Sequence, residues 1–163
     1  MAKAKRLNSM RLLDANSIAY EVYHYDAAER NARQVAAAVG FSADEVFKTL
    51  VVNGPGTRKP VLVMLPSNTT LDLKRLAKAM GRKKVALASH ADAEKLTGLQ
   101  VGGISAMALM GKNWEVYLDR RAEAFEQIVI SAGQRGLQLR VATADLIRLL
   151  GCQRVDVAAP ASS

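Results

Sequence analysis

The stretch that decides the fold is VFKTLVVNGPGTRKPVLVMLP, which runs from Val46 to Pro66. Two runs of apolar and β-branched residues, 46–52 and 60–66, flank a segment dense in glycine and proline. This pattern predicts two strands joined by a somewhat long hairpin turn. Because strands joined by a short connection run in opposite directions, the pairing at this point is expected to be antiparallel.

On either side of this hairpin, helix and strand patterns alternate without a regular βαβ repeat. Thr143 is expected to cap the last helix, and Asn31 and Asp72 to stand at the starts of two earlier ones. Helices are expected over 3–16, 29–41, 71–81, 90–98 and 143–151, and further strands over 19–25, 83–89, 114–120, 127–133 and 137–142. Together these elements predict an α+β fold with a mixed, largely antiparallel, barrel-like sheet surrounded by helices. We expect a single domain over residues 1–157 and a disordered tail over 158–163.

The composition narrows the classes of function. One cysteine and two isolated histidines give no metal-ligand spacing, so we expect neither a metal nor another cofactor. The apolar runs are strand-length and the basic start has no signal-peptide core, which favours a cytoplasmic protein without a membrane partner. The formal net charge of +8 favours a polyanionic partner such as nucleic acid; a basic but merely solvated surface is the alternative.

Lys48 is the most informative charged residue, because it lies inside an otherwise apolar strand. With a period of two, Lys48 shares one face with Val46 and Leu50. An ammonium group is costly to bury without a partner. Lys48 therefore either lies at a strand edge, with its stem reaching to water, or lines a pocket that binds an anion such as a phosphate or carboxylate.

A second informative stretch is LTGLQVGGISAMALMGK, from Leu96 to Lys112, which contains four glycines. It is either a flexible connection or a loop whose backbone N–H groups converge on a ligand oxygen. The turn SAGQRG, 131–136, closes a hairpin and carries Arg135, which can meet a phosphate. Asp119 ends a strand, where its carboxylate can cap a turn or orient a ligand amine. Neither Cys152 nor the histidines have the neighbours of a nucleophilic enzyme.

Several of these segments together resemble a known family. The ordered set is VFKTLVV, LDLKRLAKAMG, LTGLQVGGIS, the strand ending at Asp119, and ISAGQRG. In order and spacing it is similar to the YbaK/EbsC family of aminoacyl-tRNA deacylases, which is related to the editing insertion of bacterial prolyl-tRNA synthetases. The resemblance covers roughly residues 5–155.

The resemblance implies an enzyme that releases a wrongly attached amino acid from the acceptor end of tRNA, with Cys-tRNA(Pro) or a related species as substrate. It implies backbone N–H groups that hold the oxyanion, and a ribose hydroxyl or substrate thiol that replaces a protein nucleophile. Tyr25 stands where relatives have a tyrosine. The implied catalytic residues are Lys48, Gly102, Gly103 and Ser105. The implied substrate-binding residues are Tyr25, Thr49, Ile104, Asp119, Ser131, Gly133 and Arg135.

By analogy, the resemblance also implies a transient association with prolyl-tRNA synthetase, and no DNA partner. The sequence departs from the family after Ser105, where relatives continue with Pro-Leu-Gly and this chain has AMALMG, 106–111. We expect Met107 and Met110 to fill part of the pocket and to alter the choice of amino acid. The alternative function is a non-catalytic tRNA- or nucleotide-binding module with the same fold.

Overall fold

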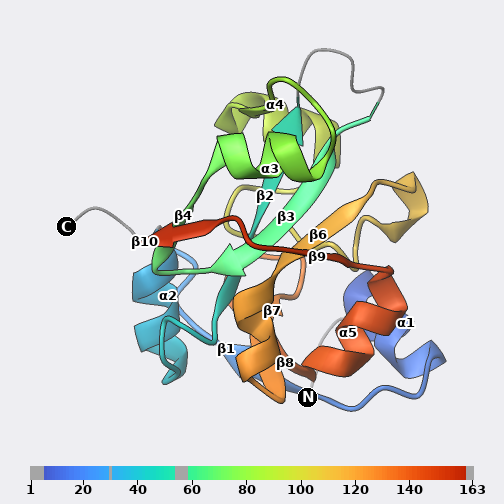
Figure 1. The fold of residues 1–163 in the computed structure, drawn as a ribbon. Helices are drawn as coiled ribbons and strands as arrows, with labels where there is room; N and C mark the ends of the chain where they lie inside the picture. Colours follow the sequence, from blue (N-terminus) through green and yellow to red (C-terminus); the bar gives the residue numbers. More distant parts are fainter. Residues whose placement is uncertain (1–5, 30, 54–58, 161–163) are drawn as a thin grey trace, which may run out of the picture.

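The computed structural model describes residues 6–29, 31–53 and 59–160. The helices are α1 (Asn8–Ala15), α2 (Ala32–Val39), α3 (Leu73–Ala79), α4 (His90–Thr97) and α5 (Thr143–Leu150), with short 3-10 turns η1 (Met110–Lys112) and η2 (Arg120–Ala124). The strands are β1 (Tyr20–His24), β2 (Phe47–Asn53), β3 (Val61–Pro66), β4 (Thr69–Leu71), β5 (Ala86–Leu87), β6 (Val116–Asp119), β7 (Gln127–Ser131), β8 (Leu137–Ala142), β9 (Gln153–Val155) and β10 (Ala158–Pro160). The predicted α+β class is confirmed (Figure 1).

The strands of the described residues form three sheets. A five-stranded sheet has the order β5-β2-β3-β6-β9, a three-stranded sheet the order β1-β8-β7, and β10 pairs with β4. The pairs β3–β6 and β6–β9 are parallel, and the other pairings between these strands are antiparallel, as the sequence predicts. The strands do not form one continuous barrel-like sheet, although a bridge between Val46 and Val129 joins the two larger sheets.

The central strand β3 is buried along its whole length. Leu62 and Met64 belong to the larger hydrophobic cluster, which also contains buried residues of α1 and α5. Val61 and Val63 belong to a second cluster on the opposite face of the sheet, which α3 covers. Because both faces of β3 are covered, its sequence is a continuous apolar run without polar alternation.

Local capping places three of the helices where the sequence predicts them. The side chains of Asn31, Asp72 and Ser89 accept hydrogen bonds from backbone N–H groups in the first turns of α2, α3 and α4. The expected cap at Thr143 is wrong. Ala142 precedes α5 without a side-chain cap, and the Thr143 hydroxyl donates to the carbonyl of Phe125 at 2.8 Å.

The C-terminal segment corrects the expectation of a disordered tail over 158–163. Residues Ala158–Pro160 form β10, which pairs with β4 and lies beside it in Figure 1. The Asp72 N–H also donates to the Val157 carbonyl at 2.8 Å. Residues 161–163 lie outside the described residues. Within the described part of the chain, no helix is long and apolar enough to span a bilayer.

Candidate functional site

A cavity of about 510 Å³ opens between the start of α2, strands β2 and β4, and the glycine-rich loop. Six residues that the resemblance implied line it: Tyr25, Lys48, Thr49, Gly102, Ile104 and Ser131. They come from the end of β1, from β2, from the loop after α4 and from β7. Segments more than 100 residues apart in the sequence therefore meet at one cavity.

Lys48 is half-buried in the wall of this cavity. Its Nζ donates to the Thr69 carbonyl at 2.5 Å. Burial lowers the pKa of Lys48, and the nearby positive charge of Arg33 lowers it further. Strand β2 pairs with β3 at Lys48 and with β5 only at Val52 and Asn53, but the Lys48 amine bonds to the carbonyl of Thr69, which also lines the cavity. The structure therefore favours the pocket position of Lys48 over the alternative at a strand edge.

The glycine-rich loop is held tightly against the turn 131–136. The Arg135 Nε donates to the Val101 carbonyl at 2.7 Å. Gly102 has φ of +93°, and a Cβ on Gly103 would lie 2.8 Å from the backbone nitrogen of Arg135. The Tyr25 hydroxyl approaches the Gly102 carbonyl at 3.5 Å. The glycines therefore let two loops pack backbone to backbone, which a flexible connection would not need.

Four implied site residues lie behind the wall of the cavity and do not line it: Gly103, Ser105, Gly133 and Arg135. The Gly103 N–H donates to the Gln100 carbonyl at 2.8 Å, so it is not free to hold an oxyanion. Ser105 is only 2% exposed, and its Oγ accepts from the Ala108 N–H at 3.4 Å. In this structure these residues support the loop, and the direct part of Gly103 and Ser105 in catalysis stays a prediction.

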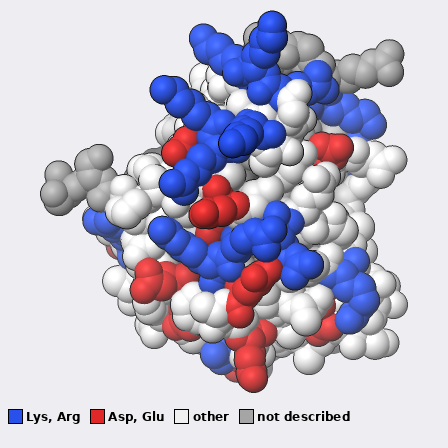
Figure 2. Space-filling model, viewed as in Figure 1, with Lys and Arg blue, Asp and Glu red and all other residues white. Residues whose placement is uncertain are grey.

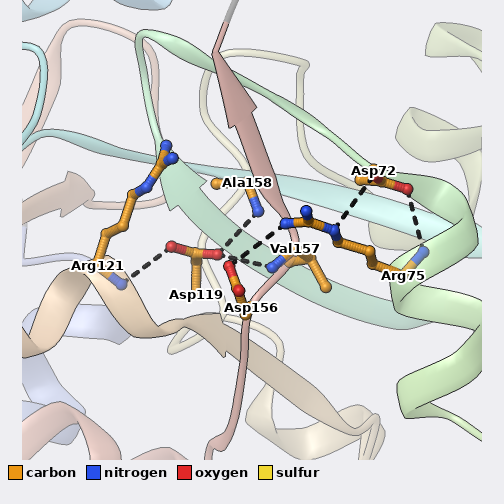
Figure 3. Close-up of polar contacts among 7 residues, drawn as sticks. All are labelled: Asp72, Arg75, Asp119, Arg121, Asp156, Val157 and Ala158. Carbon is orange, nitrogen blue, oxygen red and sulfur yellow. Dashed lines mark hydrogen bonds and ion pairs between the residues drawn. The ribbon is translucent and has the colours of Figure 1, made fainter.

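Asp119 is also not at the cavity. Its carboxylate is fully buried and accepts hydrogen bonds from the N–H groups of Arg121, Val157 and Ala158 at 2.9–3.0 Å (Figure 3). Of its two expected roles, the structure therefore supports turn capping and not the orientation of a ligand amine. The same carboxylate holds the segment that leads into β10.

Comparison with known proteins agrees with this geometry. Residues 26–149 match the aminoacyl-tRNA editing domain family. The chain belongs to this family. It is 36% identical, over 96% of its length and 98% of the relative, to an Enterococcus faecalis protein named "Putative Cys-tRNA(Pro)/Cys-tRNA(Cys) deacylase EbsC". It is 31% identical, over 68% of its length and 67% of the relative, to the "Multifunctional Ser/Thr-tRNA deacylase ProXp-y" of Escherichia coli.

Solved structures support the editing-domain fold. A crystal structure described as "a putative trans-editing enzyme for prolyl tRNA synthetase" superposes with a TM-score of 0.78, over 96% of this chain and 99% of that one, at 22% identity. The resemblance to YbaK/EbsC deacylases is thus confirmed at the level of the family and the fold.

The editing-domain pocket also contains polar residues that the sequence analysis missed, namely Glu29, Arg33, His90 and Gln138. Arg33 follows the Asn31 cap by two residues, so the predicted start of α2 was a signal that it lies near a helix terminus. Gln138 alternates with apolar residues along β8, a pattern that is typical of a solvent-facing side chain. It is instead 5% exposed, and its Oε1 has no hydrogen-bond partner among the described residues.

The methionines of the altered segment AMALMG do not line the pocket. Met107 is 3% exposed and packs in the larger hydrophobic cluster, while Met110 is 39% exposed. The expectation that these side chains fill part of the editing pocket is therefore wrong. Ala106 and Leu109 of the segment are buried in the same cluster.

Among the described residues, neither the cysteine nor the Ser67 and Thr69 hydroxyls of the cavity wall are activated as nucleophiles. Cys152 does not line the cavity, and burial raises the pKa of this thiol to about 11, so it stays protonated at neutral pH. The Ser67 and Thr69 hydroxyls donate to backbone carbonyls at 2.8 and 2.7 Å. Among the described residues, no group of three or more His, Cys, Asp or Glu is placed to hold a metal ion.

Proposed function

We propose that this chain hydrolyses the ester that joins a mischarged amino acid to the acceptor end of a tRNA, acting in trans in the cytoplasm. One observation carries the proposal: the Lys48 amine and the glycine-rich loop line the same cavity. Membership of the family suggests ester hydrolysis as the reaction. The residues that line the cavity carry charged and hydrogen-bonding groups that this reaction can use.

The polar groups of the pocket match those of an aminoacyl-tRNA end. Lys48 and Arg33 offer positive charge to the terminal phosphate or the ester oxygen, and Glu29 offers a carboxylate to the amino group of the amino acid. The Gly102 N–H makes no hydrogen bond to a described residue, so it can donate to the oxyanion that develops on the carbonyl.

In the proposed reaction, the oxygen of water attacks the ester carbonyl carbon. The bond from that carbon to the ribose oxygen breaks, and the ribose oxygen receives a proton as it leaves. A neighbouring ribose hydroxyl relays that proton from the attacking water. In the alternative route, a thiol of the amino acid attacks its own carbonyl carbon, the same carbon–oxygen bond breaks, and the thiol proton passes to the ribose oxygen. Water then hydrolyses the cyclic thioester to the free amino acid. Both routes are substrate-assisted, which fits the lack of activation at Cys152, Ser67 and Thr69.

The names of the two relatives suggest the substrate class, because they describe deacylases for cysteine and for serine or threonine. We therefore propose a small amino acid with a thiol or hydroxyl on its side chain, carried on tRNA(Pro) or another tRNA. Transient association with prolyl-tRNA synthetase is part of this proposal.

A second candidate function is a non-catalytic tRNA-binding module. It is favoured by the Gly103 N–H, which is already hydrogen-bonded, and by the buried Ser105. The test is release of radiolabelled amino acid from cysteinyl, alanyl, seryl and threonyl esters of tRNA(Pro) and other tRNAs. The deacylase proposal expects at least one ester to be cleaved faster than in buffer. Binding of tRNA without cleavage of any ester would favour the binding module.

A further inference from the structure

The positive charge of the chain is concentrated in one stretch. Residues 73–89 contain six of the 23 lysines and arginines and none of the 15 aspartates and glutamates. The formal charge of this stretch is therefore +6, compared with +8 for the whole chain. Most of the net charge thus belongs to α3 and the segment after it, and the pocket residues account for little of it.

The charged side chains of this stretch are exposed to solvent. Leu76 and Ala77 of α3 pack into the second hydrophobic cluster, which leaves the opposite side of the helix to solvent. We call the exposed cations of this stretch, apart from Arg75, the basic face: Lys74, Lys78, Arg82, Lys83 and Lys84. Figure 2 shows lysine and arginine side chains gathered over the upper part of the visible face, where Figure 1 places α3 and α4.

The charges of the basic face are not neutralised by neighbours. Arg75, which is left out of it, lies 3.6 Å from Asp72 and 3.7 Å from Asp156 (Figure 3). By contrast, none of the five basic-face residues forms an ion pair with a described residue. Five exposed cations without acidic partners repel one another, and a polyanion relieves that repulsion.

Short chain segments join the basic face to pocket-lining residues at both of its ends. Thr70 lines the pocket, and Lys74 follows it by four residues, a span of at most about 14 Å. His90 lines the pocket as well and follows Lys84 by six residues. A chain of phosphates that enters the pocket with its terminal nucleotide can therefore continue along this surface.

We propose that the basic face binds the phosphate backbone of the tRNA acceptor arm behind the terminal nucleotide. This inference rests on the proposed function, because it takes the pocket to hold the aminoacyl end. Phosphate contacts of this kind do not depend on the base sequence. The basic face would therefore add affinity for any tRNA, while the choice of amino acid stays with the pocket.

The test compares two double variants with the wild type. Lys74→Ala with Lys78→Ala removes two charges from the basic face. Arg11→Ala with Arg148→Ala removes two exposed charges from α1 and α5, which lie at the opposite end of the molecule (Figure 1). Binding of uncharged tRNA is measured between about 50 and 200 mM salt. Turnover is measured on the ester that the wild type cleaves, carried on the trinucleotide CCA.

The inference expects the basic-face variant to bind tRNA roughly tenfold more weakly at low salt, with a salt slope smaller by about two. The α1–α5 variant should bind like the wild type, and all three proteins should cleave the CCA ester equally. Unchanged tRNA affinity and slope in the basic-face variant would overturn the inference and leave the proposed function standing. Loss of CCA-ester turnover in that variant would also overturn it. A wild type that neither binds tRNA nor cleaves any ester would refute both.

Discussion

At Lys48, a charged amine lies half-buried in a strand whose neighbouring residues are mostly apolar. Water is partly excluded from the amine, and the guanidinium of Arg33 lies near it, so two effects disfavour its proton. A bound anion would offset both effects, because it would supply a counter-charge. This environment is what the proposed anionic ligand of Lys48 would require.

The pKa of Lys48 can be measured directly by NMR after reductive ¹³C-methylation of the lysines, with Lys48→Arg to assign the resonance. We expect a pKa below the ordinary lysine value in the wild type. In Arg33→Ala the pKa should rise but stay below the ordinary value, because burial is the larger cause and remains. An ordinary lysine titration in the wild type would contradict the described environment.

Asp119 is expected to be a stabilising residue and not a ligand-binding one. Asp119→Ala leaves the N–H groups of Val157 and Ala158 without their acceptor, and both residues are buried. We expect the free energy of unfolding, measured in urea, to fall by about 2–5 kcal/mol. Asp119→Asn keeps one acceptor oxygen, so its loss should be smaller, about 1–2 kcal/mol.

The matched measurement for both Asp119 variants is kcat/KM for ester cleavage at a temperature where the protein stays folded. It should equal that of the wild type, because Asp119 does not line the pocket. An Asp119→Ala protein of normal stability and weakened substrate affinity would instead assign the carboxylate to the ligand.

At the scale of elements, the site depends on two loops that pack against each other. Gly103→Ala would place a Cβ 2.8 Å from the Arg135 nitrogen and 3.0 Å from the Gln134 carbonyl carbon. Both are backbone atoms, so the loops must separate. We expect a loss of about 1–3 kcal/mol in stability and a fall in ester cleavage, because Gly102 and Ile104 move with the loop.

Gly111→Ala is the control in the same glycine-rich segment. A Cβ at Gly111 meets no atom within 4 Å, so this variant should keep the stability and activity of the wild type. Equal tolerance of alanine at both positions would show that the close packing of the loops is not needed. The two variants separate a requirement at Gly103 from a general effect of losing a glycine.

Elements with local signals could be predicted from the sequence, and elements that depend on distant partners could not. Helices α2, α3 and α4 begin directly after Asn31, Asp72 and Ser89, whose side chains accept hydrogen bonds from neighbouring backbone N–H groups. Strands β4, β9 and β10 have three residues each and exist because of pairing across the fold. The segment into β10 is held by the Asp119 carboxylate, 38 residues earlier in the chain, and no local pattern shows that contact.

At the scale of the whole molecule, the residues of the candidate site also divide into those with a local sequence signal and those that only the fold brings together. Lys48 stood out because a lysine in an apolar strand is a local anomaly, and the structure places it at a cavity. Arg33 and His90 lie on exposed parts of helices and became candidates only when the fold brought them to that cavity. The family resemblance implied that Asp119 binds the substrate. In the structure its carboxylate is instead occupied by hydrogen bonds from backbone N–H groups.

The pocket and the basic face together describe a protein with two surfaces for one substrate. The pocket, with Lys48 and the glycine-rich loop, would act on the aminoacyl ester, and the basic face on the phosphates behind it. This division explains why most of the net charge lies outside the cavity. It also means that loss of the chemical step and loss of tRNA binding should be separable by substitution.

The most direct test of the central claim is single-turnover release of amino acid from mischarged tRNA by the wild type and by Lys48→Ala, with Arg11→Ala as the control. We predict that the wild type and Arg11→Ala cleave the same ester at the same rate. Lys48→Ala should cleave it at least roughly a hundredfold more slowly, because the terminal phosphate or the ester oxygen loses a charged donor. A wild type that binds tRNA and is as inert as Lys48→Ala on every ester, or a Lys48→Ala protein as active as the wild type, would contradict the account.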